Sequence, residues 1–218
     1  MVTANDLQGI MAMMPAFTTK DGDRPDAEDT VDTGELTRAV DQIIRDGGAN
    51  VITTTGSFGE FHTLLWEEHK KLIEATVATT RKRVPVFIGC TNLNPREAMR
   101  QARFAQQAGA DGLLLGVPFY YQATVDNVIQ FYHDIADDLP KMGIMIYHNP
   151  THHRGHDPGG RIQKDHGETQ HRWHERQPPH PAAVHRADEH GESQNQRLRQ
   201  PDPGVSLRHA RRFRVLVV

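Results

Sequence analysis

The residues best suited to chemistry lie in a glycine loop around Ser57. The loop follows the β-branched run Val-Ile-Thr-Thr-Thr at 51–55 and has Gly56 and Gly59 on either side of Ser57 and Phe58. A helical pattern comes next, so the loop is predicted at the carboxyl end of a buried strand, where α/β sheets bind ligands. Two glycines allow backbone N–H groups to converge on an anion, and the Ser57 hydroxyl adds a donor. The loop therefore fits a carboxylate or a phosphate, although a tight strand-to-helix turn that binds nothing is the alternative.

The elements that position this loop alternate regularly along the chain. Strands are predicted at 9–14, 50–54, 84–89, 112–116 and 143–147. Between them lie helical patterns whose predicted N-caps are Asp32, Thr63, Asn94 and Thr124. The turns at 48–51 and 109–113 are similar, which suggests a repeated unit. A strand–helix repeat near 30 residues predicts a parallel sheet, in either a barrel or a doubly wound fold.

Composition limits the class of protein. The chain has 218 residues and a formal net charge of -3, which fits one sizeable core and no nucleic-acid or membrane-surface partner. No apolar run approaches the roughly 20 residues of a membrane-spanning helix. Cys90 is the single cysteine, so a disulfide framework is excluded and a reducing, cytoplasmic location is predicted.

Three motifs together resemble a known family. They are Gly-Ser-Phe-Gly-Glu at 56–60, Gly-Val-Pro-Phe-Tyr-Tyr at 116–121 and Ile-Tyr-His-Asn-Pro at 146–150. The set resembles the dihydrodipicolinate synthase and N-acetylneuraminate lyase superfamily, and within it the trans-o-hydroxybenzylidenepyruvate hydratase-aldolases. These are Schiff-base aldolases on a (β/α)₈ TIM barrel. The resemblance covers about residues 1–154, which implies that only the first five β/α units of the barrel are represented.

The resemblance implies a role for each motif. Ser57, with the amides of Ser57 and Phe58, would hold the carboxylate of a pyruvyl group, and Tyr147 would shuttle protons during water addition and carbon–carbon cleavage. Phe58, Phe119 and Tyr120 would form an apolar wall for an aromatic substrate. The full set of substrate-binding residues it implies is Ser57, Phe58, Gly59, Tyr120 and Asn149. The partner would be a small 2-keto acid, with no metal or organic cofactor, and the family assembles as homotetramers.

The nucleophile that the resemblance requires is absent from its expected place. The family's lysine lies about one β/α unit beyond the tyrosine, near Glu175 and Arg176, where this chain has no lysine. The only lysine after Lys141 is Lys164, in a segment with no strand pattern and no desolvated pocket to lower an amine pKa. The chain as written is therefore predicted to be inactive. A dihydrodipicolinate synthase-like or sugar-acid lyase-like enzyme, and a non-catalytic truncated barrel, are the alternatives.

We predict that the tail at 155–218 is translated in a different reading frame from residues 1–154. Back-translation of 172–178 with one base removed yields Val-Gly-Met-Lys-Asp-Ser-His, which resembles the family's lysine strand. The segments 156–160, 184–190 and 211–218 behave in the same way. The tail is rich in His, Arg and Pro, so we expect it to be out of frame and disordered. The spacing of His171 and His174 fits no zinc site.

Overall fold

The computed structural model describes residue 2 and residues 6–147 of the chain. Five strands form one sheet: β1 (Ile10–Met14), β2 (Ala49–Thr54), β3 (Val86–Gly89), β4 (Gly112–Leu115) and β5 (Gly143–Ile146). The helices are α1 (Thr33–Arg45), the 3₁₀ turn η2 (Phe61–Thr63), α2 (Trp66–Thr80), α3 (Pro95–Ala108) and α4 (Val125–Asp138). The predictions made for Asn149 and for all later residues, including the tail, lie outside this part.

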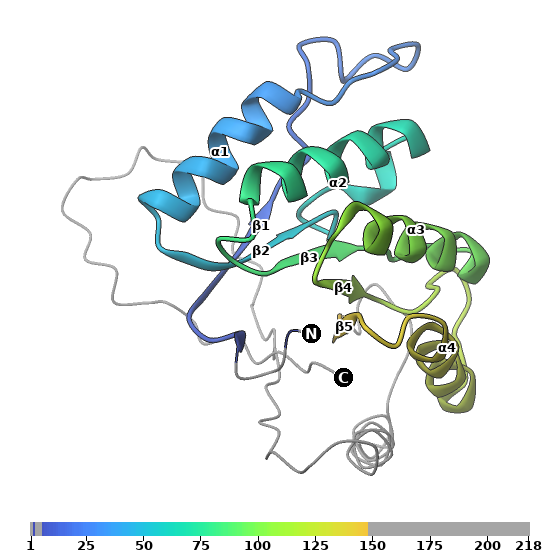
Figure 1. Cartoon of the computed structure of the whole chain (residues 1–218). Helices are drawn as coiled ribbons and strands as arrows, with labels where there is room; N and C mark the ends of the chain where they lie inside the picture. The colour runs from blue at the N-terminus through green and yellow to red at the C-terminus, as the bar shows by residue number, and fades with distance from the viewer. Residues whose placement is uncertain (1, 3–5, 148–218) are drawn as a thin grey trace, which may run out of the picture.

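The order of the strands decides between the two predicted architectures. Every strand pairs in parallel with the next strand of the sequence, in the order β1-β2-β3-β4-β5. A doubly wound sheet reverses its order at a switch point and carries helices on both faces. Here α1 to α4 all lie on one side of the strands (Figure 1). The described residues therefore form the first five strands of a (β/α)₈ barrel with their helices outside.

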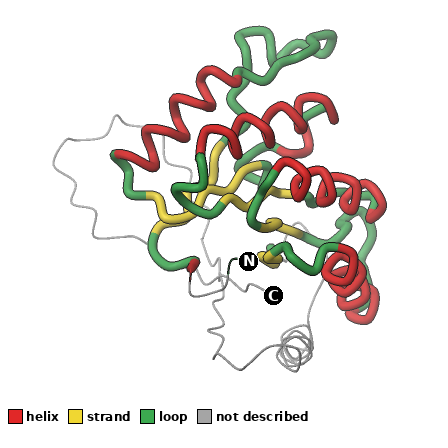
Figure 2. Tube along the Cα trace, viewed as in Figure 1, coloured by secondary structure: helices red, strands yellow, loops and turns green. Residues whose placement is uncertain are grey.

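Apolar side chains alternate between the two faces of the sheet. Toward the helices, Ile52 of β2 and Leu36 of α1 belong to one buried cluster, and Leu113 of β4 and Ile135 of α4 to another. The inner face carries a third cluster that contains no residue of α1–α4: Val51, Phe87, Leu114 and Met145, with Met11, Met13 and Tyr147 beside it. Figure 2 shows the strands inside the arc of helices. Tyr147 thus belongs to the barrel interior.

Three of the predicted helix starts are confirmed. The Asp32 carboxylate accepts the N–H of Glu35 at 2.8 Å, and the Asn94 side chain accepts the N–H of Arg96 at 3.0 Å. The Thr124 hydroxyl accepts the N–H of Asn127 at 3.2 Å. In each case the side chain satisfies an N–H that the first helical turn leaves without a partner.

The fourth predicted cap, Thr63, is wrong. Its hydroxyl donates to the Glu60 carbonyl, and α2 begins only at Trp66. The reason is Glu68, whose carboxylate reaches back to the N–H of Leu65 at 2.8 Å and so fixes Leu65 as the N-cap. Leu65 is consequently 57% exposed.

The repeated turn at 48–51 and 109–113 has a physical basis. Gly48 and Gly109 both adopt positive φ, at 65° and 92°, which favours glycine. Two residues later, Asn50 accepts the N–H of Ile10 at 2.8 Å, and Asp111 accepts the N–H of Val86 at 3.0 Å. Each turn therefore fastens the start of its strand to the start of the preceding strand.

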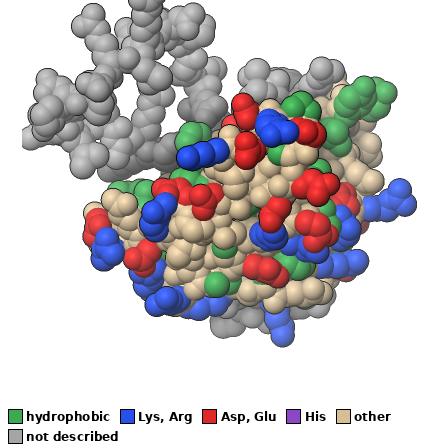
Figure 3. Space-filling model, turned by 90° about the horizontal axis from the view of Figure 1, so that it is seen from above, with side chains coloured by type: hydrophobic (Ala, Val, Ile, Leu, Met, Phe, Trp, Pro, Cys, Tyr) green, Lys and Arg blue, Asp and Glu red, His purple; other side chains and the backbone are tan. Residues whose placement is uncertain are grey.

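The outer surface of the helices is a mixed-charge surface. In the view from above, acidic and basic side chains are interspersed (Figure 3). Several form exposed ion pairs, including Arg45 with Asp41 at 3.2 Å and Arg103 of α3 with Asp138 of α4 at 2.7 Å. Exposed pairs of this kind each contribute little to stability, so the fold depends on its apolar clusters.

Glu68 also ties the long β1–α1 connection to α2. Its buried carboxylate accepts the Thr30 N–H at 2.7 Å and the Thr30 hydroxyl at 2.6 Å, besides the Leu65 N–H. Burial alone would raise the pKa of Glu68, but these hydrogen bonds outweigh it and hold the pKa below its ordinary value. The carboxylate is therefore ionised in the folded protein and satisfied by three donors.

We expect Glu68→Gln to lower the free energy of unfolding by about 1–3 kcal/mol, because an amide accepts these hydrogen bonds less strongly and adds donors without partners. Urea denaturation at neutral pH measures the change. Glu67→Gln is the matched control, since Glu67 is the preceding residue and its side chain is 73% exposed. Equal effects of the two substitutions would contradict the role given to Glu68.

Candidate active site

The loop after β2 is shaped by two residues that are not glycine. Thr55 and Glu60 adopt left-handed backbone conformations, with φ of 54° and 51°, whereas Gly56 and Gly59 do not. The glycines serve instead to make room. A Cβ on Gly56 would lie 2.8 Å from the Met13 sulfur, and one on Gly59 would lie 2.6 Å from the Thr55 nitrogen. The two glycines thus allow the loop to pack closely against β1 and against itself.

The loop brings Ser57 to Tyr147. The Ser57 hydroxyl donates to the Tyr147 hydroxyl at 3.1 Å, although the two residues are 90 positions apart. The N–H of Tyr147 donates to the Leu115 carbonyl at 2.9 Å and so extends the β4–β5 pairing beyond Ile146. Both residues therefore lie at the carboxyl ends of the parallel strands, Ser57 after β2 and Tyr147 after β5. Their hydroxyl groups form a polar pair above the apolar interior.

The predicted aromatic wall lies at the same edge. Phe58 and Tyr120, on the loops after β2 and β4, are 67% and 63% exposed. Phe119 packs edge-to-face on Phe61, with ring centroids 6.1 Å apart. Gly59 is buried. Phe58 and Tyr120 are thus accessible to a ligand at this edge, while Phe119 is partly held by the η2 turn.

Sequence reasoning missed Thr55 and Gly89. The buried Thr55 hydroxyl donates to the Gly89 carbonyl at 2.8 Å. A Cβ on Gly89 would lie 2.0 Å from the backbone carbonyl oxygen of Thr55. The end of β3 therefore presses directly on the backbone of the β2 loop. A glycine that ends an otherwise apolar strand indicates such a close approach, and this was the signal available at Gly89.

Cys90 has no place in this site. It is completely buried, and burial raises the pKa of its thiol, which keeps it protonated and unreactive.

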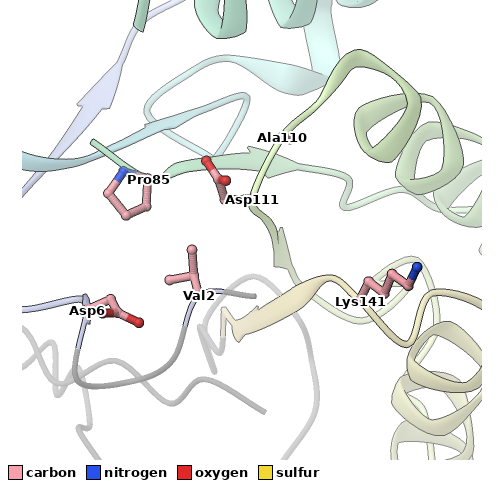
Figure 4. A pocket seen from close by; sticks show the side chains of 6 residues that line it. All are labelled: Val2, Asp6, Pro85, Ala110, Asp111 and Lys141. Carbon is pink, nitrogen blue, oxygen red and sulfur yellow. The ribbon is translucent and has the colours of Figure 1, made fainter. Parts of the chain in front are cut away.

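A surface hollow lies at the opposite ends of the strands from the Ser57–Tyr147 pair (Figure 4). Its lining residues are Val2, Asp6, Pro85, Ala110, Asp111 and Lys141. Pro85 and Asp111 directly precede β3 and β4, so the hollow is at the amino ends of the strands. Barrel enzymes carry out their chemistry at the carboxyl ends, which separates this hollow from the Ser57–Tyr147 pair.

Two further searches cover only residues 2 and 6–147. Within them, no group of three His, Cys, Asp or Glu side chains is placed to hold a metal ion. No helix in the same residues is long and apolar enough to span a membrane.

Comparison with known proteins decides the family. A model of the Dihydrodipicolinate synthetase family matches residues 10–154, more than half of the chain. The chain belongs to this family. The dihydrodipicolinate synthetase match covers all five strands and ends seven residues beyond Tyr147.

The family members most informative here are hydratase-aldolases. The trans-o-hydroxybenzylidenepyruvate hydratase-aldolase of Pseudomonas putida is 41% identical over 149 residues, which are 68% of this chain and 45% of that protein. The trans-2'-carboxybenzalpyruvate hydratase-aldolase of Nocardioides sp. (strain KP7) is 32% identical over 68% of this chain and 44% of that protein. The chain therefore has a lyase ancestry and spans less than half the length of these relatives.

Solved structures of the family agree in fold. PhdJ bound to a substrate intermediate superimposes with a TM-score of 0.69 at 33% identity, over 71% of this chain and 47% of that one. YagE from E. coli K12, a prophage protein of the dihydrodipicolinic acid synthase family in complex with pyruvate, gives 0.66 at 28% identity over 73% and 51%. The similarity supports the assignment of the described strands to a family barrel.

Proposed function

We propose that this chain carries the part of a hydratase-aldolase site that binds a 2-keto acid, and that it binds such an acid without cleaving it. The observation that carries the proposal is the 3.1 Å contact between the Ser57 and Tyr147 hydroxyl groups at the carboxyl edge of the sheet. Relatives at 41% and 32% identity are named hydratase-aldolases of arylidene pyruvates. Their substrates share the pyruvyl group that this pair suits.

The chemistry of the pair follows from the structure of a 2-keto acid. The carboxylate is bonded directly to the keto carbon, so an anion held by the Ser57 hydroxyl and the amides of Ser57 and Phe58 would bring the keto group to Tyr147. A phenol hydroxyl both donates and accepts a hydrogen bond. Tyr147 therefore suits the proton transfers that carbinolamine formation, hydration and carbon–carbon cleavage require in this family.

The substrate side chain is assigned from the aromatic residues. Exposed Phe58 and Tyr120 present apolar surface on the loops after β2 and β4, at the same ends of the strands as the pair, which suits the aryl group of an arylidene pyruvate such as trans-o-hydroxybenzylidenepyruvate. A dihydrodipicolinate synthase-like or N-acetylneuraminate lyase-like reaction is the second candidate. The large apolar side chain at Phe58 and the names of the relatives from Pseudomonas putida and Nocardioides favour the hydratase-aldolase function.

The proposal that the chain does not turn over substrate rests on its lysines. The sequence has no lysine near Glu175 and Arg176, and the segment beyond residue 154 is proposed to be out of frame. Without a lysine amine in the site, no imine forms with the keto group to accept electrons from the bond that breaks. The chain would then be a non-catalytic member of a lyase family that retains weak affinity for the keto acid and for other subunits.

Pyruvate binding tests the proposal. We expect calorimetric titration to detect weak, reversible binding, and Ser57→Ala to weaken it by about tenfold or more, because a hydrogen bond to a carboxylate contributes about 1.5–3 kcal/mol. Tyr147→Phe should weaken binding as well, since it removes the partner of Ser57.

The matched control is Thr79→Ala, which removes a hydroxyl from α2 whose hydrogen bond in the described part of the chain is to the Thr37 hydroxyl. It should leave pyruvate affinity unchanged. Affinity that is the same in Ser57→Ala as in the unmodified protein would contradict the assignment of the carboxylate cradle.

A further inference from the structure

We propose that Thr55 is the positioning residue of this site: its buried hydrogen bond to the Gly89 carbonyl holds a strained backbone turn that sets Ser57 against Tyr147. The inference rests on the proposed function of the Ser57–Tyr147 pair. The Thr55 hydroxyl bonds to Gly89 and to neither hydroxyl of the pair, so it acts through the backbone of Gly56 and Ser57.

The first observation is backbone strain. Thr55 has a φ of 54°, in the left-handed region that β-branched residues avoid because their Cβ crowds the backbone. Glycine or asparagine would adopt this conformation with less strain. Strain of this kind persists only where surrounding contacts enforce it, and it is concentrated at functional sites.

The second observation is the set of contacts that enforces the conformation. Gly89 and Gly59 approach the Thr55 backbone so closely that a Cβ would lie 2.0 Å from the Thr55 oxygen in one case and 2.6 Å from its nitrogen in the other. Thr55 is fully buried between them. The peptide that leads into Ser57 is therefore held from β3 on one side and from its own loop on the other.

The third observation concerns the hydroxyl group. Thr53, Thr54 and Thr55 are consecutive and all fully buried, but the hydroxyl groups of Thr53 and Thr54 have no hydrogen-bond partner within the described part of the chain. Only Thr55 donates, to the Gly89 carbonyl at 2.8 Å. This bond crosses from β2 to β3 at the point where the chain turns, so it fixes the direction in which the loop leaves the sheet.

The turn then determines the geometry of the pair. Ser57 is two residues beyond Thr55, whereas Tyr147 is anchored separately by its N–H to Leu115 on β4. A change in the Thr55 backbone would move Ser57 while Tyr147 stays in place. The contact between the two hydroxyl groups is consequently a direct readout of the position that Thr55 sets.

The test is ¹³C NMR of the full chain labelled at the tyrosine ring, with the Tyr147 signal assigned from its loss in Tyr147→Phe. In Thr55→Val the Tyr147 signal should move toward its position in Ser57→Ala, and pyruvate affinity should fall by about tenfold. Thr55→Ser keeps the hydroxyl and should restore both. Thr54→Val removes a hydroxyl without a described partner from the adjacent residue and should change neither.

Thr55→Gly keeps the test valid if the valine variant does not fold, because glycine relieves the strain while removing the hydrogen bond. It too should displace the Tyr147 signal. An unchanged Tyr147 signal in folded Thr55→Val or Thr55→Gly would overturn the positioning role, whatever the result for pyruvate. Failure of the unmodified chain to bind pyruvate would instead count against the proposed function, so the two failures are distinguishable.

Discussion

Acidification from about pH 6.5 to about pH 4 should remove about 3 kcal/mol of stability through His69 alone. His69 is 4% exposed in α2, and its Nε2 has no hydrogen-bond partner in the residues that the structure describes. Burial lowers the pKa of His69 from 6.5 to about 4, and a hydrogen bond to the Gly89 carbonyl and the charge of Glu97 only partly oppose this. The imidazole is therefore neutral in the folded protein at neutral pH.

The direction of the effect follows from proton uptake. Above pH 6.5 His69 is neutral in both the folded and the unfolded chain, so it adds no pH dependence. Below that value the unfolded chain binds a proton that the folded chain excludes until about pH 4, and the folded state loses stability throughout this interval. Folding lowers the pKa of Glu68 from its ordinary value of 4.5. The stability that the Glu68 carboxylate contributes is therefore retained above pH 4.5 and is lost as the pH falls further.

Urea denaturation of the unmodified protein, His69→Gln and His62→Gln at about pH 7 and about pH 5 measures the effect. His62 lies on the exposed η2 turn and is the matched control. His69→Gln should have a smaller loss between the two pH values, and His62→Gln should behave as the unmodified protein. The comparison is of the change with pH within each variant, because His69→Gln also alters packing. If the free energy of unfolding of His69→Gln falls between the two pH values as much as that of the unmodified protein, His69 is excluded as the source of the pH dependence.

Much of the described fold could be predicted because its determinants are local. Strand positions followed from short apolar runs, and each observed strand starts or ends within two residues of its prediction. The caps at Asp32, Asn94 and Thr124 were correct because a side chain two or three residues before its partner N–H is enough to make them. Strand order required the structure, since alternation alone allows a barrel or a doubly wound sheet.

The errors share a physical cause, which is competition between local signals and contacts from elsewhere. Thr63 has the chemistry of a cap, but Glu68 fixes the start of α2 three residues later, and it is itself held by Thr30 across 38 residues. Thr55 belongs to a β-branched run, which favours extended backbone and gives no sign of a left-handed residue. Its left-handed turn is imposed by Gly89 and Gly59, which pattern reasoning treats as separate elements.

The candidate site divides in the same way. The motif resemblance selected Ser57 and Tyr147, and the structure brings their hydroxyl groups to 3.1 Å. It did not select Thr55 or Gly89, because their importance depends on how closely two backbones approach. Residue types therefore indicated what chemistry the site suits, whereas only the packing of β2 against β3 explains how the loop is held.

The second large effect expected is the absence of covalent pyruvate. An imine-forming lysine must be desolvated to be neutral and nucleophilic near neutral pH. None of the lysines in residues 2 and 6–147 is buried: Lys70, Lys71 and Lys82 are ion paired, Lys141 lines the hollow at the opposite edge, and Lys20 is exposed. Residues 148–218 add only Lys164, which comes eleven positions before Glu175 in the sequence, where the resemblance places the family's amine.

The central claim is that this chain binds a 2-keto acid without forming an imine. Borohydride reduction in the presence of pyruvate, followed by intact-mass and peptide mass spectrometry, tests this claim most directly. A full-length hydratase-aldolase, such as the relative from Pseudomonas putida, is the positive control and should gain the mass of one reduced pyruvyl group. We expect this chain to keep its original mass at pyruvate concentrations that saturate Ser57-dependent binding. A stoichiometric adduct on any of its lysines, Lys164 above all, would show that the chain forms the imine and would contradict the proposal that it binds without turnover.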